Sequence, residues 1–385
     1  MSGPSQSETE NHLAMKGNII LVTDGSYGDV LPFLAIASHL SKKQYGERHV
    51  FLLCSEHFEQ LVQTTNPNIH FVSTCSKSFY SERWGASADT NRKINDASAM
   101  ITGAKSLVER QRDIYKLMYG IIAGNLPKDN SNNPTKTVIL AHPLVSAANI
   151  FCEKYAESLN VSMITILLSP IYLRSFEHDY YPAYIMKAYY YFVDIMLDSV
   201  LAGPINKLRN EMNGKSSKIS RICHNWLLSD SCIIALFPKW FVRSEPIPKL
   251  SNVTKFMGFI TPEKNVVSNG TNSNSDFPDS LKHFMEEGKR KELKIIVFTP
   301  GSLNPPNATK FFMVGKAAVE KLNADRERVA AIFLTKYKNV LPKDVSAERH
   351  KNIVHFTFIS LSDLLESCHL CVHHGGTDNL HSAEM

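Results

Sequence analysis

Short apolar runs of β-strand length alternate along the chain with longer stretches that have helical periodicity. This alternation predicts parallel sheets covered by helices, because parallel neighbours are joined by crossover connections. The runs form two groups, one in each part of the chain. The predicted strands are residues 18–23, 50–54, 69–73, 137–141, 163–168 and 232–237 in the first group, and 294–299, 330–335, 353–358 and 370–373 in the second.

The composition changes between the two groups of predicted strands. Residues 262–280 are rich in Asn, Ser, Gly and Pro, which is typical of a linker. The sequence therefore predicts an α/β protein with two domains. The second domain has few strands for a doubly wound sheet, so we expect it to be incomplete. The predicted boundaries are 1–16 for a disordered tail, 17–260 for the first domain, 261–292 for the linker and 293–385 for the second domain.

The overall composition and charge limit the kinds of molecule that the protein is expected to bind. The chain is 43% hydrophobic and 21% charged, which is ordinary for a globular protein. Its net charge of +5 is modest, and no block of like charges is present. A nucleic-acid partner would need a basic stripe, so we expect none. Small anionic ligands stay compatible with this charge.

The sequence carries no targeting signal that we recognise. The polar, acidic start of the chain does not resemble a signal peptide. The most apolar stretch, residues 184–201, is interrupted by Lys187, Asp194 and Asp198, so we expect no transmembrane segment. The seven cysteines are scattered and odd in number, which fits a reducing compartment. We expect a cytoplasmic protein, with association at a membrane surface left open.

The first motif, "DGSYGD", follows the first predicted strand and precedes a helix that we expect to begin at Pro32. In open α/β sheets, ligands bind at the carboxyl ends of strands. Gly25 and Gly28 allow close backbone approach, while Ser26 and Asp29 supply a hydroxyl and a carboxylate. Asp29 is therefore a candidate general base. The alternative is that Asp29 only caps the helix.

A second loop, "FTPGSLNPP", follows the strand predicted at 294–299. Gly301 and Ser302 could present backbone N–H groups and a hydroxyl to a phosphate at a helix N-terminus. A simple β-turn enforced by the prolines is the alternative.

A third loop, "VHHGGTDN", follows the strand predicted at 370–373. Histidine can donate to a phosphate, and the glycines let the backbone approach it. A metal site at His373, His374 and His381 lacks an acidic partner at a metalloprotease-type spacing, and a plain helix cap is the third possibility. The candidate anion site of this loop consists of two histidines, two glycines and a threonine, namely His373, His374, Gly375, Gly376 and Thr377.

An aromatic stretch, "YLRSFEHDYYPAYIMKAYYYF", covers residues 172–192. These side chains could form core, line a site for an apolar acceptor, or lie on a membrane surface. We expect mainly core.

The chain has no Asp-x-Asp motif. Metal-dependent sugar transferases commonly use such a motif to hold a divalent ion on a diphosphate. We therefore expect no metal and no cofactor, with backbone donors, histidine and helix dipoles compensating the charge.

Taken in order, several segments resemble the GT-B glycosyltransferases that use UDP- or dTDP-sugars, in particular the sterol glucosyltransferases and the macrolide and glycopeptide glycosyltransferases. The segments are "GSYGDVLP", "FMGFI", "IIVFTPGS", "FISLSDLL" and "VHHGG". The resemblance implies the GT-B fold, in which two Rossmann-like doubly wound domains face a cleft.

The resemblance also implies roles for individual residues. Asp29 would deprotonate the acceptor hydroxyl, with Ser26 beside it and with Gly25 and Gly28 in the acceptor loop. Phe358 would stack on the base of the donor, and the backbone of Ile359 would reach the uracil edge. The donor phosphates would be held by Gly301, Ser302, His374, Gly375, Gly376 and Thr377.

The implied activity is transfer of a hexosyl group, glucose being the expected one, from a UDP-sugar to a hydroxyl of a lipophilic acceptor, with inversion and without a metal. The UDP-sugar is a co-substrate. Segments that hold the donor sugar in such enzymes have no counterpart before Met385, so we expect a truncated enzyme. The alternative is a catalytically incomplete GT-B protein that acts as a nucleotide-binding or partner-binding subunit.

Overall fold

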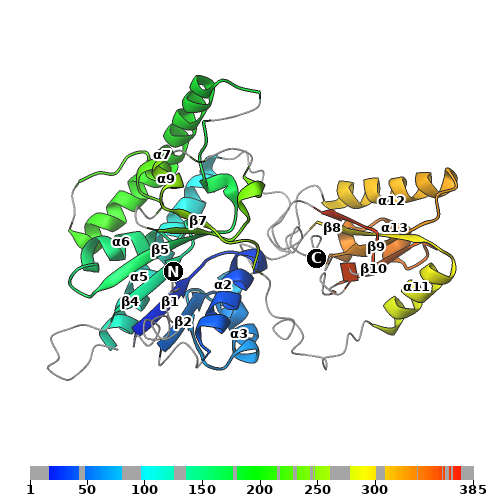
Figure 1. Ribbon diagram of the computed structural model, residues 1–385, viewed down its shortest axis with the longest axis horizontal. Coiled ribbons are helices and arrows are strands. Elements are labelled where there is room, and N and C mark those ends of the chain that lie inside the picture. The colour runs from blue at the N-terminus through cyan, green and yellow to red at the C-terminus, as the bar shows by residue number, and fades with distance from the viewer. Residues whose placement is uncertain are drawn as a thin grey trace, which may run out of the picture. The chain divides into compact units, whose positions relative to one another are not determined.

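The computed structural model describes most of the chain. The described residues are 17–42, 48–79, 97–124, 136–176, 180–214, 217–228, 232–242, 246, 248–260, 278–300, 308–335, 337–357, 359, 364–365 and 367–373. They form two compact units, the first built mainly from residues up to Ile260 and the second mainly from Thr261 to Met385. Each unit contains one parallel sheet with helices (Figure 1), so the predicted fold class is confirmed.

The first unit is built on a seven-stranded sheet in the order β3-β2-β1-β4-β5-β6-β7. Every pair of neighbouring strands is parallel. Such strands are covered on both faces, which explains why they read as continuous apolar runs in the sequence. The strands are β1 Gly17–Val22, β2 Arg48–Cys54, β3 Ile69–Ser73, β4 Thr137–Ala141, β5 Val161–Leu167, β6 Ile233–Ala235 and β7 Thr254–Phe256.

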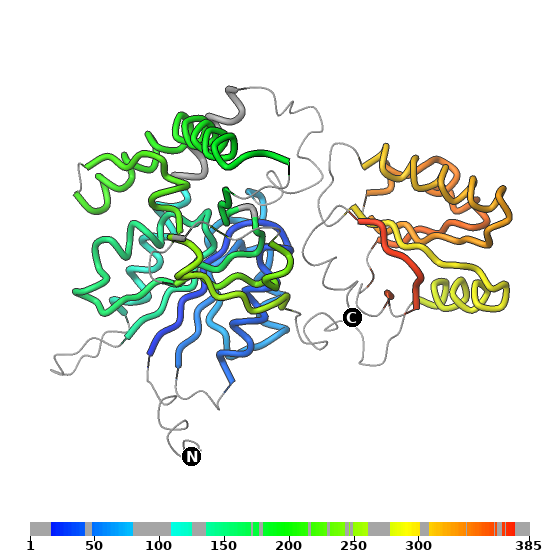
Figure 2. The backbone as a smooth tube through the Cα atoms, turned by 45° about the horizontal axis from the view of Figure 1, so that its top comes forward, coloured from blue at the N-terminus to red at the C-terminus, as the bar shows by residue number. Residues whose placement is uncertain are grey.

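Helices cover the two faces of this sheet in an order that its connections dictate. The chain runs from β1 outward to β3, then returns to the other side of β1 for β4. Right-handed crossovers that progress in opposite directions place their helices on opposite faces. The first face receives α2 Tyr27–Leu40 and α3 Glu59–Thr65, and the second receives α5 Ala97–Gly124, α6 Ser146–Tyr155 and α7 Ala183–Asn213 (Figure 2).

The core of the second face joins α5, α6 and α7 to the central strands. Ile20 and Val22 of β1 and Ile139 of β4 pack with Phe151 of α6 and Leu208 of α7. The strand order reverses between β1 and β4, so the residues that follow these two strands meet at the carboxyl edge of the sheet. This reversal positions the candidate site described below.

The second unit has a four-stranded parallel sheet in the order β10-β9-β8-β11. Its centre contains an aromatic cluster, in which the ring of Phe312 lies 5.0 Å from that of Phe333, and Phe333 lies 5.3 Å from Phe298. The main elements are β8 Lys294–Thr299, β9 Val329–Leu334, β10 Ile353–Phe356, β11 Leu370–His373, α11 Asp279–Arg290 and α12 Ala308–Ala324.

Two elements differ from the sequence expectation. The segment predicted as a linker, 261–292, includes α11, and Leu281 of this helix is buried with Ile295 and Val297 in the second unit. Residues 279–290 are therefore part of the second unit. Strand β7 was not predicted, because three residues are too short to show a periodicity.

The remaining short elements connect strands and helices at the surface. They are η2 Glu56–Phe58, η3 Pro170–Tyr172, α8 Ile222–Asn225, η4 Lys239–Phe241, α9 Pro248–Ser251, η5 Lys338–Val340 and α13 Lys343–Ser346. No helix in the described part of the chain is long and apolar enough to cross a bilayer.

We predict that Phe312→Ala destabilises the second unit by about 3–5 kcal/mol, because it leaves a cavity in the aromatic cluster. Phe312 is fully buried, whereas its neighbour Met313 is 53% exposed. Met313→Ala is therefore the matched control and should change the unfolding free energy by less than about 1 kcal/mol. Urea denaturation followed by circular dichroism measures both. Equal effects of the two substitutions would contradict this assignment of the core.

Candidate active site

The loop after β1 leads directly into α2, which begins at Tyr27 and not at Pro32 as expected. Pro32 lies inside the helix, where its ring fixes a helical φ and costs one hydrogen bond to the carbonyl of Gly28. Asp29 therefore lies in the first turn of α2. A carboxylate is favoured there by the helix dipole, so the position suits both a capping role and a chemical one.

Gly25 places the Asp29 carboxylate by having no side chain. Its φ is +154°, a value that other residues rarely adopt. A Cβ atom at this position would lie 2.1 Å from Oδ2 of Asp29. The carboxylate therefore occupies the space that any larger residue at position 25 would fill. Gly28, in contrast, lies in the first turn of α2.

The other carboxylate of the loop, Asp24, is committed to an ion pair. Both of its oxygens contact the guanidinium of Arg110 on α5, at 2.7 and 2.6 Å. Both side chains are buried, and the Arg110 guanidinium also lies 4.8 Å from the centre of the Phe79 ring. A largely buried ion pair of this kind is costly to break by removing one partner. It fixes the loop and leaves Asp29, whose side chain is 33% exposed, as the more accessible carboxylate.

His142 joins the site from the end of β4, and the sequence analysis did not single it out. Its backbone N–H donates to the carbonyl of Val22, at 3.0 Å, which ties the exits of β4 and β1 together. Its Nε2 atom lies 4.0 Å from Oδ1 of Asp29. A lone histidine after a strand has no motif, and only the pairing of β1 with β4 brings it to Asp29.

The protonation state of His142 follows from its contacts. The backbone N–H of Leu144 donates to Nδ1 at 3.3 Å, so the neutral ring carries its proton on Nε2, the atom toward Asp29. Burial lowers the pKa of His142, although the Asp29 and Asp24 carboxylates oppose this shift. Burial therefore dominates, and the ring is neutral at physiological pH. A neutral N–H donor thus faces a partly exposed carboxylate.

Tyr172, at the end of η3, packs against the His142 ring. The two rings meet edge to face, with centres 6.0 Å apart. Burial, followed by the Asp29 charge and Cys223, raises the pKa of Tyr172 to about 12. The phenol is therefore neutral and cannot act as a base near neutral pH. Ser26 directly precedes α2 and is partly buried, so the hydroxyl lies at the start of the same helix.

In the second unit, the strands that precede the two predicted phosphate loops are neighbours. β8 and β11 pair in parallel, with Thr299 opposite His373 at their carboxyl ends. The strand order reverses at this pair too. Ile359 is buried in the core with Leu281 and Val297. The other predicted donor residues, Gly301, Ser302, Phe358, His374, Gly375, Gly376 and Thr377, lie outside the described residues.

One cluster of potential metal ligands occurs among the described residues, formed by Glu320, Asp344 and His350. The ammonium of Lys316 lies 2.9 Å from Asp344 and 3.5 Å from Glu320. A protein cation therefore already sits among these groups, and the cluster is a surface ion-pair network. It belongs to the second unit and contains none of the predicted site residues.

Comparison with known proteins places this geometry in a fold family. No protein-family model and no curated protein sequence matches the chain. Solved structures do match. The glycotransferase of kitacinnamycin has a TM-score of 0.59 at 12% identity, covering 96% of this chain and 78% of that one. CalG4, the calicheamicin glycosyltransferase, has a TM-score of 0.57 at 12% identity, and the match covers 96% of this chain and 76% of that one.

A plant enzyme gives a similar result. Medicago truncatula UGT71G1, solved with UDP-glucose, matches with a TM-score of 0.56 at 10% identity, covering 98% of this chain and 79% of that one. The chain therefore has the GT-B fold of glycosyltransferases. The resemblance inferred from the sequence motifs is confirmed at the level of the fold.

We predict that His142 makes the protein less stable in acid. Because the folded-state pKa of His142 is lowered, its stabilising effect is complete above the unfolded-state pKa of about 6.5 and is lost as the pH falls below it. The loss is at most about 1.4 kcal/mol per pH unit. The difference in unfolding free energy between wild type and His142→Gln should therefore shrink or reverse as the pH is lowered from about 7.5 to about 5.5. Urea denaturation at the two pH values measures this difference. A pH-independent difference would refute the assignment of a buried neutral ring.

Proposed function

We propose that this chain is an inverting glycosyltransferase. It transfers a hexosyl group, most simply glucose, from a UDP-sugar to a hydroxyl of a lipophilic acceptor without a metal ion. The observation that carries the proposal is the partly exposed Asp29 carboxylate at the β1–β4 reversal of a GT-B fold, beside a neutral histidine N–H. A base at this place meets an acceptor that is bound by the first unit.

Asp29 is the general base of the proposed reaction. Its carboxylate takes the proton of the acceptor hydroxyl as the oxygen attacks the anomeric carbon of the sugar. The bond from that carbon to the UDP oxygen breaks at the same time, and UDP leaves with the bonding electrons. Attack from the face opposite the leaving group inverts the anomeric centre. The products are the glycoside, UDP and one proton carried by Asp29.

His142 is the positioning residue for this base. Its neutral Nε2–H faces Asp29 without consuming the carboxylate in a salt bridge. Burial keeps the ring neutral, so His142 does not place a full positive charge beside Asp29, where such a charge would weaken the carboxylate as a base. Gly25 contributes by leaving room for the carboxylate.

The donor is assigned to the loops that follow β8 and β11. Support comes from the pairing of Thr299 with His373, after which Gly301, Ser302 and His374 follow in sequence. Backbone N–H groups and a histidine suit the diphosphate of a UDP-sugar. The structure of Medicago truncatula UGT71G1 with UDP-glucose supports the choice of donor class. The choice of a lipophilic acceptor rests on the aromatic residues around Tyr172.

We predict that Asp29→Asn lowers kcat for sugar transfer by about 10²–10⁴-fold, because the amide cannot accept the proton. UDP release from UDP-glucose is measured with a panel of lipophilic alcohols, and UDP binding is measured by calorimetry. The nucleotide affinity should not change. Asp113→Asn, which alters an exposed carboxylate of α5 in the same unit, is the matched control.

Each outcome of this experiment has a distinct meaning. Normal turnover by Asp29→Asn would refute the base assignment. UDP binding without transfer by the wild-type chain would instead favour a nucleotide-binding subunit. Loss of UDP binding in the variant would mean that Asp29 acts on the donor.

A separate prediction concerns the donor loop. His374→Ala should raise the Kd for UDP by roughly tenfold or more, because a hydrogen bond to a charged phosphate contributes about 1.5–3 kcal/mol. His381→Ala is the control, since this histidine lies beyond the predicted phosphate motif. Calorimetric titration of UDP compares the two. Equal effects would contradict the assignment of His374 to the phosphates.

A further inference from the structure

The N-terminal half of α7 exposes a continuous row of large apolar side chains. Tyr184 is 71% exposed and Phe192 is 60% exposed. Their spacing repeats every three or four residues, which places them on one side of the helix. This exposed apolar stripe consists of Tyr184, Ile185, Tyr189, Tyr191, Phe192, Ile195 and Met196.

The side of the same half that faces the protein carries a buried acidic residue among partly buried apolar ones. Asp194 is only 1% exposed, and both of its oxygens contact the guanidinium of the buried Arg174, at 2.9 and 2.5 Å. Arg221 adds a third contact at 3.1 Å. A surface helix usually keeps its large apolar side chains on the inner side, whereas here many of them are exposed. Ion pairs hold this half to the unit, while its apolar side faces outward.

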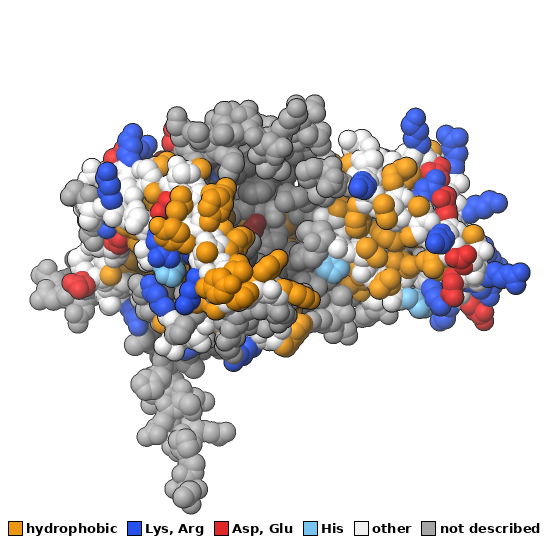
Figure 3. Space-filling view, turned by 90° about the horizontal axis from the view of Figure 1, so that it is seen from above, with side chains coloured by type: hydrophobic (Ala, Val, Ile, Leu, Met, Phe, Trp, Pro, Cys, Tyr) orange, Lys and Arg blue, Asp and Glu red, His pale blue; other side chains and the backbone are white. Residues whose placement is uncertain are grey.

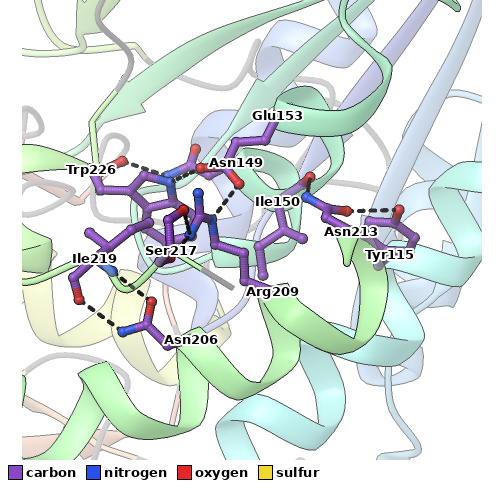
Figure 4. A network of polar contacts seen from close by, with 10 residues as sticks. All are labelled: Tyr115, Asn149, Ile150, Glu153, Asn206, Arg209, Asn213, Ser217, Ile219 and Trp226. Atoms are coloured by element: carbon purple, nitrogen blue, oxygen red, sulfur yellow. Dashed lines mark hydrogen bonds and ion pairs between the residues drawn. The ribbon is translucent and has the colours of Figure 1, made fainter. Parts of the chain in front are cut away.

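The C-terminal half of α7 is held firmly, so the stripe has a fixed orientation (Figure 4). Arg209 donates to Glu153 of α6 at 2.6 Å, and the indole of Trp226 donates to the same carboxylate at 2.8 Å. Asn206 exchanges two hydrogen bonds of 2.8 Å with the backbone of Ile219. A network with this many satisfied groups fixes the direction of the helix.

A basic cavity of about 620 Å³ adjoins the stripe. Lys187, Arg221 and Lys249 line it together with Tyr190 and Tyr191, and Tyr191 also belongs to the stripe. The Lys187 ammonium lies 5.2 Å from the centre of the Phe176 ring, and the Arg221 guanidinium lies 5.7 Å from that of Tyr191. Cations and aromatic rings therefore share this wall.

The described side chains that line the cavity include four basic ones, Arg174, Lys187, Arg221 and Lys249, and no acidic one. The carboxylate of Asp194 is occupied by Arg174 and Arg221, and that of Asp198 accepts from the backbone N–H groups of Arg221 and Ile222. Burial, followed by Arg221 and Arg174, lowers the pKa of His224 in this wall. The lowered pKa agrees with an excess of positive charge.

Figure 3 shows hydrophobic side chains gathered over the first unit, with Lys and Arg side chains at the border of this area. Exposed apolar areas with a polar rim mark interaction surfaces. Tyrosine is favoured where an apolar phase meets water, and basic groups are attracted to anionic lipid headgroups. The combination matches a helix that lies in the plane of a bilayer.

We propose that the exposed apolar stripe and the basic cavity beside it are a docking surface for a membrane that contains anionic phospholipid. Phe192, Ile195 and their neighbours insert among the acyl chains near the headgroups. Lys187, Arg221 and Lys249 bind lipid phosphates at the rim. This proposal does not depend on the proposed sugar transfer. It concerns where in the cell the protein acts, namely at a membrane surface.

A second copy of the chain fits this surface less well. In a symmetric dimer the same patch meets itself, so the basic walls of both copies would be brought together. Like charges at an interface oppose association. An anionic bilayer instead complements both the apolar stripe and the positive rim.

Co-sedimentation with vesicles tests the proposal. We expect the full chain to bind vesicles of phosphatidylcholine mixed with phosphatidylserine, to bind pure phosphatidylcholine weakly, and to be released by salt. The variant Tyr184→Ser/Phe192→Ser/Ile195→Ser should bind roughly tenfold or more weakly to the mixed vesicles, because it removes the inserted groups. Lys187→Glu/Lys249→Glu should lose most of the preference for phosphatidylserine.

Matched control variants distinguish binding through this surface from nonspecific binding to vesicles. Met313→Ser/Val314→Ser removes exposed apolar side chains from α12, and Lys207→Glu reverses an exposed charge on the C-terminal half of α7. Both controls should bind as wild type does, and circular dichroism checks that every variant folds.

Two results would overturn the proposal. One is failure of the wild-type chain to bind mixed vesicles. If the stripe variant then also converts a dimer to a monomer, the surface is an interface between two copies of the chain. The other is equal vesicle binding by the stripe variant and its control. Sugar transfer is assayed separately with lipophilic alcohols and without vesicles, so failure here is distinguishable from failure of the proposed activity.

Discussion

The right-handed connection between parallel strands is the constraint on which both units depend. In the first unit the chain leaves β1 in one direction, reaches β3, and returns to the other flank of β1 for β4. The second unit repeats this at β8 and β11. Helices then cover opposite faces, and the two strands at each reversal end side by side at the carboxyl edge of their sheet. The predicted site residues follow the strands that meet at these two reversals.

The strands could be predicted because strands buried on both faces are uninterrupted apolar runs, and long runs are hard to mistake. The misses have physical causes. β7 has only three residues, which is too short to show a hydrophobic periodicity. α11 comes directly after a segment with the composition of a linker. α2 begins before Pro32 and continues through it. The aromatic stretch was expected to be core, yet many of its side chains are exposed. A stripe has the same spacing whether it faces inward or outward, and only the Asp194–Arg174 pair reveals which side is inside.

The site residues illustrate the limit of motif reasoning. Asp29 could be singled out from the sequence because its loop resembles a motif of the glycosyltransferase family, whereas its spacing alone also allows a simple helix cap. His142 could not, since it depends on β4 pairing with β1. The structure also separates the two carboxylates of the loop, which the sequence treats alike. Asp24 is neutralised by Arg110 in a buried pair, whereas Asp29 faces an uncharged ring and keeps a third of its side chain exposed. The environment, rather than the residue type, sets this difference in exposure and charge pairing.

Gly25 has a consequence for how mutational data on this loop are interpreted. A methyl group at this position would occupy the place of the Asp29 carboxylate, so the smallest possible substitution acts on a neighbour four residues away. Alanine scanning normally removes contacts, but here it would add one. A systematic scan would score position 25 as functionally essential although it carries no side chain to react. The information it returned would concern the geometry of a different residue.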